Sequence, residues 1–348
     1  MDFTPTEEQA AAAELAARIF GDLSTHERLT AAGTGSDAGL WKELCSAGLV
    51  AAVADTGLLG LVLLLEEQGR TTAQVPFAVS CVYGLLALTA HGSPEQRERL
   101  LPGIADGTVV VTGAVPGPGV RSVSGALTGV LPAVPWLRDA THVLVADDRR
   151  ELWLVRVAEA AASEPVELTA PWSAGRLTLE GTPGEALGGP GAYEDLLATA
   201  RTAFAGLQAG VCAGSLARAV EHTNAREQFG RPLAARQGVQ LRAADAYMDT
   251  EAIRVTAYEA AWRRDEGLSY VTHALTAAWW ASEAGQRVVH TGQHLHGGAG
   301  ADLGHPVHRH FLWGRQLDAY LGGGGEVLQE LGEAIVNGEP IVNGEAGA

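Results

Sequence analysis

Cysteine is scarce in this sequence, and its placement suggests neither a disulfide framework nor a metal motif. The 348 residues include only Cys45, Cys81 and Cys212, which lie far apart in apolar, helix-like contexts. This pattern argues against a small secreted scaffold and against a zinc site, and it is typical of a reducing compartment. We therefore expect a cytoplasmic protein.

Positive charge is also in deficit. Lys and Arg number 24 and Asp and Glu number 41, which gives a formal net charge of −17 at pH 7. A surface of this sign repels nucleic acid backbones and anionic lipids. We expect no nucleic acid and no membrane among the partners, and the simplest role of the acidity is solubility.

Long apolar runs are missing as well. The first residues, MDFTPTEEQ, are acidic and polar, which is unlike a secretory signal peptide. The most apolar run covers residues 57–65 and is far shorter than the roughly 20 residues that a membrane-spanning helix needs.

The first third of the chain carries helix signals. Residues 4–7 (TPTE) and 93–96 (SPEQ) each match a capping box with proline at the first helical position. Pro102 and Gly103 are expected to end the second of these helices. From about Thr108, short β-rich runs follow one another with turn residues between them, which predicts a small antiparallel barrel or sandwich.

The last third of the chain is again helical, with long elements over about 194–226 and 271–296. Between them, apolar residues recur in steps of three and four, so they form one face of a long amphipathic helix. These residues are Leu241, Ala244, Met248, Ala252, Val255, Tyr258 and Trp262. Such stripes predict a helical bundle, or part of one that a partner subunit completes.

The predicted fold class is therefore α+β and mostly α. We expect an N-terminal helical domain, a middle antiparallel β-domain, a C-terminal helical bundle and a short tail. Their bounds are 1–107, 108–190, 191–338 and 339–348.

Two motifs in the last segment carry a resemblance. Residues 226–233 read REQFGRPL, and residues 293–300 read QHLHGGAG before HPVHR at 305–309. Together with SPEQRERLLP and a C-terminal YLGG turn, in this order, they resemble the acyl-CoA dehydrogenase family. The resemblance implies a four-helix bundle as the C-terminal domain. It also implies FAD as cofactor and oxidation of the Cα–Cβ bond of an acyl-CoA thioester.

The resemblance also implies which residues bind the cofactor. In this family the flavin lies across a subunit interface, and the first motif of one subunit holds the adenine-dinucleotide half. Arg226 would pair with the diphosphate, because a guanidinium fork suits phosphate oxygens. The full set implied is Arg226, Gln228, Phe229, Leu233, Arg236, Gln293 and Gly297.

The family's catalytic base is missing. Leu321 follows Tyr320 where the family usually presents a glutamate, and Ala200 occupies the alternative position. Neither side chain can accept a proton, so no catalytic residue is predicted. The stretches 112–117 and 131–136 also depart from the family segments that offer hydroxyl groups to the flavin ring.

Both losses fall on one half of the active site, which suggests a division of labour between two chains. The sequence resembles the non-catalytic subunit of actinobacterial heterotetramers (α2β2) that act on steroid side-chain CoA thioesters. A paralogous subunit would then supply the base. The alternatives are a self-sufficient enzyme with a relocated base, such as Glu194 or Glu326, and a flavin-free scaffold of the same fold.

Five histidines gather in one stretch, and they raise the question of a metal. Imidazole is a common metal ligand, but only Asp302 offers another ligand type within the run. The run also overlays a family segment that binds no metal, so we expect none. The histidines are His294, His296, His305, His308 and His310.

Overall fold

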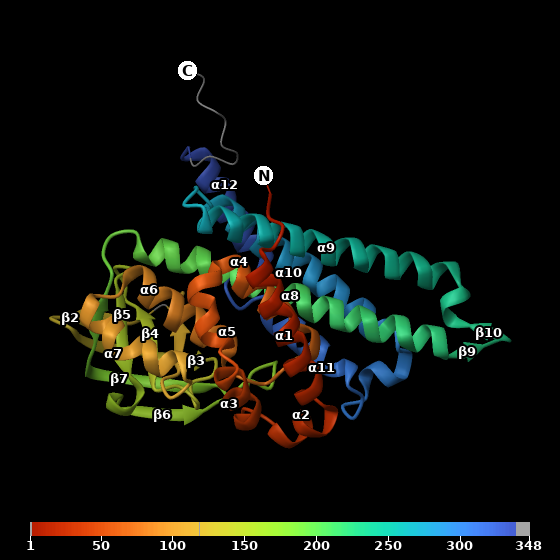
Figure 1. Cartoon of the computed structure of the whole chain (residues 1–348), viewed down its shortest axis with the longest axis horizontal. Coiled ribbons are helices and arrows are strands. Elements are labelled where there is room, and N and C mark those ends of the chain that lie inside the picture. Colours follow the sequence, from red (N-terminus) through yellow and green to blue (C-terminus); the bar gives the residue numbers. More distant parts are fainter. Residues whose placement is uncertain (1, 118, 339–348) are drawn as a thin grey trace. The chain divides into compact units, whose positions relative to one another are not determined.

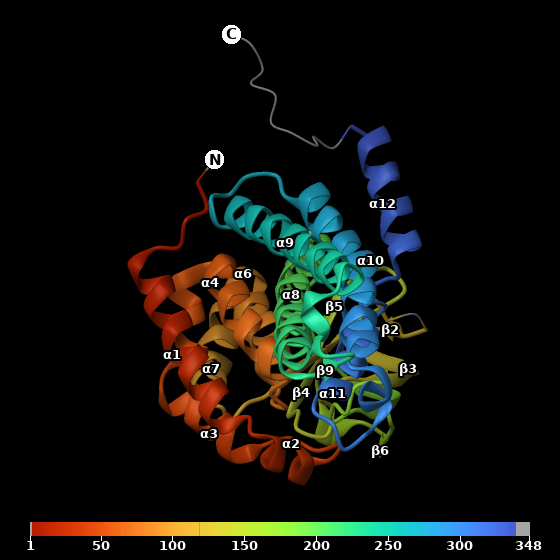
Figure 2. The same cartoon turned by 90° about the vertical axis from the view of Figure 1, so that its right-hand side faces the viewer.

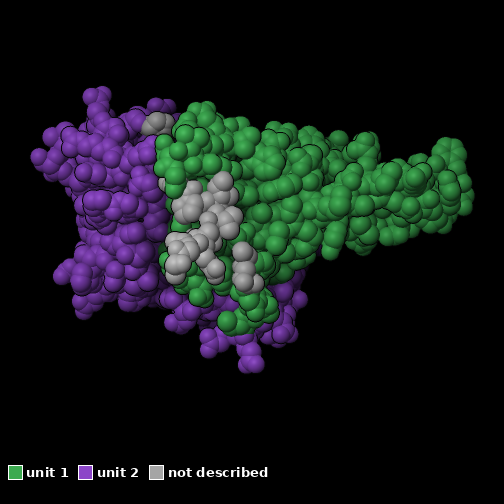
Figure 3. Space-filling view, turned by 90° about the horizontal axis from the view of Figure 1, so that it is seen from above, with its two compact units in different colours: residues 1–6, 62–73, 201–348 green, residues 7–61, 74–200 purple. Residues whose placement is uncertain are grey.

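The computed structural model describes residues 2–117 and 119–338 (Figure 1). The chain divides into two compact units, coloured separately in Figure 3. Unit 1 comprises Met1–Thr6, Val62–Ala73 and Arg201–Ala348, and unit 2 comprises Glu7–Leu61 and Gln74–Ala200. The predicted tail 339–348 lies outside the described residues.

The N-terminal part of unit 2 is helical, as predicted. Ser93 and Gln96 form the expected capping box, in which each side chain satisfies the other's backbone N–H. The capping box expected at residues 4–7 is wrong, because α1 begins only at Glu7. The helices of this part are α1 (Glu7–Leu23), α2 (His26–Ala32), α3 (Ala38–Ser46), the start of α4 (Leu49–Thr71), α5 (Phe77–Val79), the π-helix η1 (Ser80–Leu86), α6 (Ala87–His91) and α7 (Pro94–Ala105).

Pro102 does not end α7, contrary to the prediction. It lies inside the helix, which continues to Ala105. A proline in the last turn removes one backbone hydrogen bond but leaves the few residues after it free to stay helical.

The β-segment of unit 2 forms two four-stranded sheets, with orders β1-β4-β5-β8 and β2-β3-β7-β6. Leu127 and Leu131 of β3, Val143 of β4 and Leu177 of β7 belong to one buried cluster, so the two sheets share a core. All pairs are antiparallel except β1 with β4, which is parallel and corrects the all-antiparallel prediction. The strands are β1 (Val111–Ala114), β2 (Arg121–Val123), β3 (Ala126–Val134), β4 (His142–Ala146), β5 (Leu152–Arg156), β6 (Ala162–Pro165), β7 (Gly175–Pro183) and β8 (Glu185–Leu187), with the 3₁₀ turn η2 (Val157–Glu159).

Unit 1 is a helical bundle (Figures 1 and 2). Helix α10 lies among the others, because its small residues Gly285 and Gly292 meet α8 and its Arg287 pairs with Asp249 of α9. The elements are α8 (Ala192–Ala225), which begins in unit 2, then β9 (Glu227–Gln228), β10 (Arg231–Pro232), η3 (Leu233–Ala235), α9 (Gln237–Asp265), α10 (Val271–Leu295), η4 (Gly297–Ala301), α11 (Val307–Leu317) and α12 (Gly324–Val336).

Helices α4 and α8 pack with their backbones in close contact within unit 1. Gly210 and Gly214 of α8 lie against the carbonyl oxygens of Glu66 and Arg70, and a Cβ at either glycine would collide with them. Gly206 lies one turn earlier, against Val62. This four-residue repeat on both helices sets their register.

The predicted stripe on α9 is not the face that α9 buries in this chain. Leu241, Met248 and Val255 are exposed, whereas Ala246, Ile253 and Ala257 are buried. The helix therefore packs on α10 through the side that carries Ala246, Ile253 and Ala257 and leaves Leu241, Met248 and Val255 exposed.

Helices α4 and α8 are long and apolar enough to cross a membrane by length and composition alone. The run 57–65 is part of α4, which has 23 residues. The whole helix is therefore longer than the apolar run from which we judged a membrane-spanning segment too short. The apolar windows of the two helices are 67% and 72% buried, as in core helices of a globular protein. In addition, α4 is interrupted at Gly57, which has φ 71° and ψ −164°.

Candidate functional site

The first predicted motif forms a tight hairpin directly after α8. Phe229 and Gly230 have φ of 55° and 73°, the left-handed conformation that a two-residue hairpin turn requires. Gln228 and Arg231 pair across the turn. The Phe229 ring projects into solvent and is 89% exposed, and the Arg236 guanidinium lies 5.2 Å from its centre.

A cavity of about 540 Å³ opens beside this hairpin. Of the predicted cofactor residues, four line it: Arg226 between α8 and β9, Gln228 of β9, Leu233 of η3 and Gly297 of η4. Residues that sequence reasoning missed also line it, namely His222, Val239, His294, Leu295, His296, Gly298 and Ala299.

Three predicted residues lie outside the lining of this cavity. Phe229 and Arg236 contact each other, and Arg236 also donates to the carbonyl oxygen of Gln228 at 3.0 Å. The amide of Gln293 donates to the carbonyl oxygen of Gly300 at 3.3 Å. The neighbouring His294 faces the cavity instead, because adjacent residues of a helix point about 100° apart.

The backbone after α10 leaves room for a ligand. Gly297 has φ 60°, a conformation that favours glycine. A Cβ at Gly297 or at Gly298 would meet no atom within 4 Å. The main chain at this rim is thus accessible to a group in the cavity.

The rings of two predicted histidines, His296 and His305, contact each other, and His296 also contacts His222, which was not predicted. His296 stacks on His222 with centroids 4.6 Å apart, and His305 meets His296 edge-on at 5.0 Å. Among the described residues, no group of three or more His, Cys, Asp or Glu side chains is placed to hold a metal ion.

His296 has a fixed tautomer. Its Nδ1 lies 2.7 Å from the carbonyl oxygen of Gly292, which can only accept, so Nδ1 carries the proton. Burial lowers the pKa of His296, which keeps the ring neutral at pH 7 and leaves Nε2 as an acceptor. The cavity therefore combines one permanent cation, Arg226, with neutral imidazole and apolar walls. Such a lining suits a phosphate group joined to a ring or sugar.

At the usual base position, the backbone is bonded to an arginine. Leu321 is buried, and its carbonyl oxygen accepts from Nε of Arg201 at 3.3 Å. The two Nη atoms of Arg201 donate to both carboxylate oxygens of Glu330 at 2.6 and 2.8 Å. All three nitrogens of this buried guanidinium thus donate hydrogen bonds, which connect α12 to the turn at Leu321.

The alternative base positions have other partners. Ala200 is buried and offers only a methyl group. Glu326 accepts from the backbone N–H of Gly323 at 3.1 Å, as the capping residue of α12. Glu194 lies 3.8 Å from Arg150 in unit 2.

The β-domain stretches 112–117 and 131–136, which depart from the family segments, make contacts within unit 2. The Thr112 hydroxyl donates to the carbonyl oxygen of Pro135 at 2.6 Å. Trp136 is buried and stacks on Trp172 with centroids 6.0 Å apart, so it is a core residue of unit 2.

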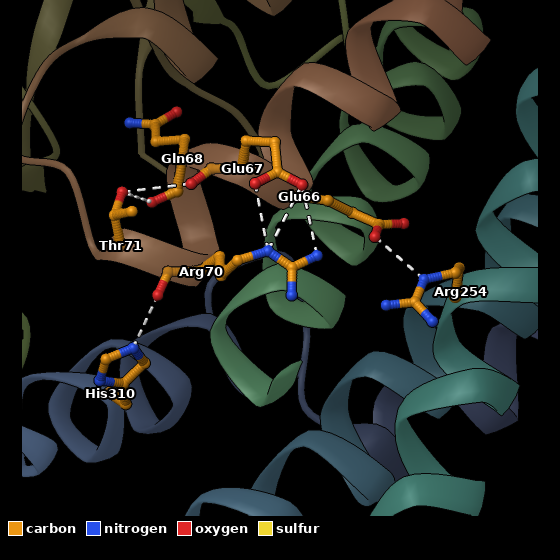
Figure 4. A network of polar contacts seen from close by, with 7 residues as sticks. All are labelled: Glu66, Glu67, Gln68, Arg70, Thr71, Arg254 and His310. Atoms are coloured by element: carbon orange, nitrogen blue, oxygen red, sulfur yellow. Dashed lines mark hydrogen bonds and ion pairs between the residues drawn. The ribbon is translucent and has the colours of Figure 1, made fainter. Parts of the chain in front are cut away.

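One buried carboxylate remains to be explained, and Figure 4 shows its surroundings. Glu66 of α4 accepts from Nε of Arg254 on α9 at 2.9 Å. Burial raises the pKa of Glu66, while Arg254 and Tyr258 act in the opposite direction. His310 donates to the carbonyl oxygen of Arg70 at 3.0 Å nearby, and burial lowers its pKa to about 4. These contacts tie α4, α9 and α11 together, so we assign Glu66 a structural role.

Two family profiles match the sequence. Residues 6–108 match the acyl-CoA dehydrogenase N-terminal domain, and residues 188–334 match the acyl-CoA dehydrogenase C-terminal domain. The chain belongs to the acyl-CoA dehydrogenase family. The predicted family and its fold, with helical, β and helical parts in that order, are thereby confirmed.

Several relatives align with this chain over nearly their whole length. Acyl-CoA dehydrogenase FadE27 of Mycobacterium tuberculosis is 33% identical over 96% of this chain and 99% of its own. The solved "Tcur3481-Tcur3483 steroid ACAD G363A variant" is 41% identical, with a TM-score of 0.90 over 95% of this chain and 98% of the other. A chain of the ChsE4-ChsE5 complex from M. tuberculosis is 30% identical, with a TM-score of 0.89 over 97% and 99%.

Proposed function

We propose that this acyl-CoA dehydrogenase chain is the non-catalytic subunit of an FAD-dependent enzyme that forms a Cα–Cβ double bond in an acyl-CoA thioester. It completes the FAD site of a paralogous subunit, and that paralogue contributes the base. The observation that carries the proposal is an asymmetry within unit 1. A cavity opens beside Arg226, whereas the aliphatic Leu321 stands at the base position, with its main-chain carbonyl bonded to Arg201.

The cavity fits the diphosphate and adenosine part of FAD. Arg226 would hold the diphosphate, and Gly297 and Gly298 would allow it to approach the main chain. Leu233 and Val239 offer apolar contact for a base or sugar. Bound FAD supplies the acceptor for the substrate's hydride, and this chain's part is to bind and orient it.

The remaining predicted contacts belong to the same proposal. Phe229 and Arg236 form the outer wall of the hairpin, from which they would reach a cofactor shared with a neighbour. We propose that His294 contacts the cofactor as well, because His294 lines the cavity, and that Gln293, whose amide donates to Gly300, supports the rim.

The partner and substrate classes follow from the relatives. One of them is a chain of the ChsE4-ChsE5 complex, and another is the Tcur3481-Tcur3483 steroid ACAD variant, whose name also joins two proteins. We infer a cytoplasmic α2β2 heterotetramer with a paralogous acyl-CoA dehydrogenase, acting on a steroid side-chain CoA ester.

A rival function is a self-sufficient enzyme with a relocated base. Glu326 and Glu194 are the candidates, but a helix cap and an arginine engage them. The second alternative is a scaffold protein that binds no flavin. The cavity beside Arg226, with its accessible main chain, argues against this alternative.

The test is dehydrogenation of acyl-CoA esters, followed with an artificial electron acceptor. The chain alone should be inactive, and co-expression with the paralogue should give activity. Leu321→Glu in the chain alone should not restore activity, because the stretches 112–117 and 131–136 lack the flavin-ring contacts. Turnover by the chain alone, wild type or variant, would contradict the proposal.

A further inference from the structure

A second cavity, of about 500 Å³, lies within unit 2. It is lined by the turn between β4 and β5, by residues of β5 and β8, and by the glycine-rich loop 188–191 that precedes α8. Its volume is in the range of small-molecule sites. The proposed cofactor role does not use it, because the cavity beside Arg226 lies in unit 1.

Two adjacent arginines of the β4–β5 turn bring positive charge to this cavity. Arg149 donates its backbone N–H to Asp147 at 2.9 Å, and no described residue bonds to its guanidinium. The Arg150 guanidinium lies 3.8 Å from a carboxylate oxygen of Glu194, and these two side chains are 69% and 53% exposed. An exposed pair at this distance is weak. Both cations are therefore available to an anion, and guanidinium forks suit phosphate oxygens.

The backbone conformation at Arg150 favours glycine. Its φ is 62°, in the left-handed region that few residues other than glycine adopt. The carboxylate of Asp147 fixes the turn by accepting from the backbone N–H groups of Arg149 and Glu151 at 2.9 and 3.0 Å. The turn therefore does not depend on the arginine side chain. A residue held in an unfavourable conformation marks a position at which a function can be sought.

The glycine-rich loop exposes main chain to the cavity. Gly188 and Gly191 have φ of 73° and 86°. A Cβ at Gly189 or at Gly191 would meet no atom within 4 Å. A ligand can thus approach the backbone closely here, as phosphates do in other glycine-rich loops.

The remaining lining suits a nucleoside rather than a bare anion. Trp153 lines the cavity together with Pro190, and its indole is fixed by a 3.1 Å hydrogen bond from Nε1 to Asp147. Aromatic side chains stack on nucleobases. Glu151 and Glu194 also line the cavity, and carboxylates accept hydrogen bonds from ribose hydroxyls in dinucleotide sites. Inorganic phosphate would use the arginines and leave the two glutamates and the indole without a role.

We propose that this cavity binds a nucleoside phosphate. Arg149 and Arg150 hold the phosphate groups, Glu151 or Glu194 accepts from the ribose, and Trp153 contacts the base. The ligand has two sources, a free nucleotide or the adenosine phosphate part of CoA. This inference goes beyond the proposed function and does not depend on it, because it uses residues of unit 2 alone.

Isothermal titration calorimetry of the full-length chain with ADP tests the proposal. Arg149→Ala and Arg150→Gly should each raise the dissociation constant about tenfold or more, the size expected for losing hydrogen bonds from a charged donor. Glycine suits the backbone at position 150, so weaker binding by Arg150→Gly does not come from a disturbed turn. The matched control is Arg176→Ala, which removes an exposed arginine of β7 in the same unit and should bind ADP like the wild type.

Arg226→Ala separates this cavity from the cofactor cavity. It should retain the ADP binding that Arg149→Ala weakens. Binding that is lost in Arg226→Ala and kept in both Arg149→Ala and Arg150→Gly would place ADP in the cofactor cavity and overturn the proposal, while the cofactor role would stand.

Three further titrations decide the ligand class and its source. No binding of ADP at millimolar concentration would overturn the proposal, and so would inorganic phosphate that binds as tightly as ADP. CoA that competes with ADP, with the same loss in Arg149→Ala, would support the site and assign it to the nucleotide part of CoA. ADP binding that CoA does not displace would support a site for a free nucleotide.

Discussion

At the scale of single residues, the proposed binding of FAD depends most on Arg226. It is the one arginine among the residues that line the cavity beside the hairpin. Arg226→Ala should raise the dissociation constant for FAD in the complex about tenfold to a hundredfold. That is the size expected for losing hydrogen bonds from a charged donor. Flavin fluorescence on dilution measures the release.

The control for that prediction is Arg99→Ala. Arg99 pairs with Glu185 at 2.6 Å, and both side chains are about half exposed, at 48% and 46%. It lies in unit 2, so its loss should leave flavin affinity unchanged. Equal flavin loss in both variants would show that the effect of Arg226→Ala is not specific to the cavity.

Glu66 and Arg254 allow a prediction about stability. Arg254→Ala leaves the buried Glu66 carboxylate without its cation, which should cost about 3–5 kcal/mol of unfolding free energy. Arg99→Ala breaks an exposed pair and should cost about 0–1 kcal/mol. Urea denaturation of the two variants measures the difference.

The pH dependence of the Arg254→Ala defect has a definite sign. Burial raises the pKa of Glu66 above its unfolded value, and removing Arg254 raises it further. The folded state then binds a proton more tightly than the unfolded state, so stability falls as pH rises from the unfolded pKa through the folded one. The variant's deficit should therefore shrink as pH falls toward 4.5, because Glu66 becomes protonated in both folded proteins and no longer needs a cation beside it. A deficit that stays constant or grows toward acid pH would contradict this assignment.

At the scale of elements, the contact between α4 and α8 depends on glycine. Gly210→Ala would place a methyl group on the carbonyl oxygen of Glu66, and both backbones are held by their own helices. We expect a loss of about 1–3 kcal/mol, as for overpacked cores. The control is Gly332→Ala in α12, where a Cβ meets nothing, and it should stabilise the helix by up to about 1 kcal/mol. Thermal unfolding of both variants measures these changes in stability. If Gly210→Ala left the stability unchanged, the two helices could move apart to accept the methyl group.

Element types were largely predictable from the sequence, and their partners were not. Capping at Ser93 depends on neighbouring residues, so a local pattern found it. The parallel pairing of β1 with β4 joins residues about 30 apart, and no local pattern encodes it. Likewise, periodicity found the stripe on α9 but could not say whether its own core or another chain covers it.

At the scale of the whole molecule, motif order was enough to predict the family, whereas the cavity required the structure. Arg226, Gln228, Leu233 and Gly297 were predicted from two motifs and meet in one cavity. His222 and His296 lie far apart in the sequence, and only the packing of α8 against α10 stacks their rings. The Arg201–Glu330 pair has the same origin, because it joins helices that are separated by most of the bundle's sequence.

We propose that this chain completes the flavin site of a partner subunit and has no complete flavin site of its own. The most direct test is the visible absorption spectrum and flavin-to-chain ratio of the purified chain, alone and co-expressed with its paralogue. The account predicts a colourless chain alone and a yellow complex with half as many flavins as chains. A yellow homo-oligomer with one flavin per chain, bleached by an acyl-CoA ester, would contradict it.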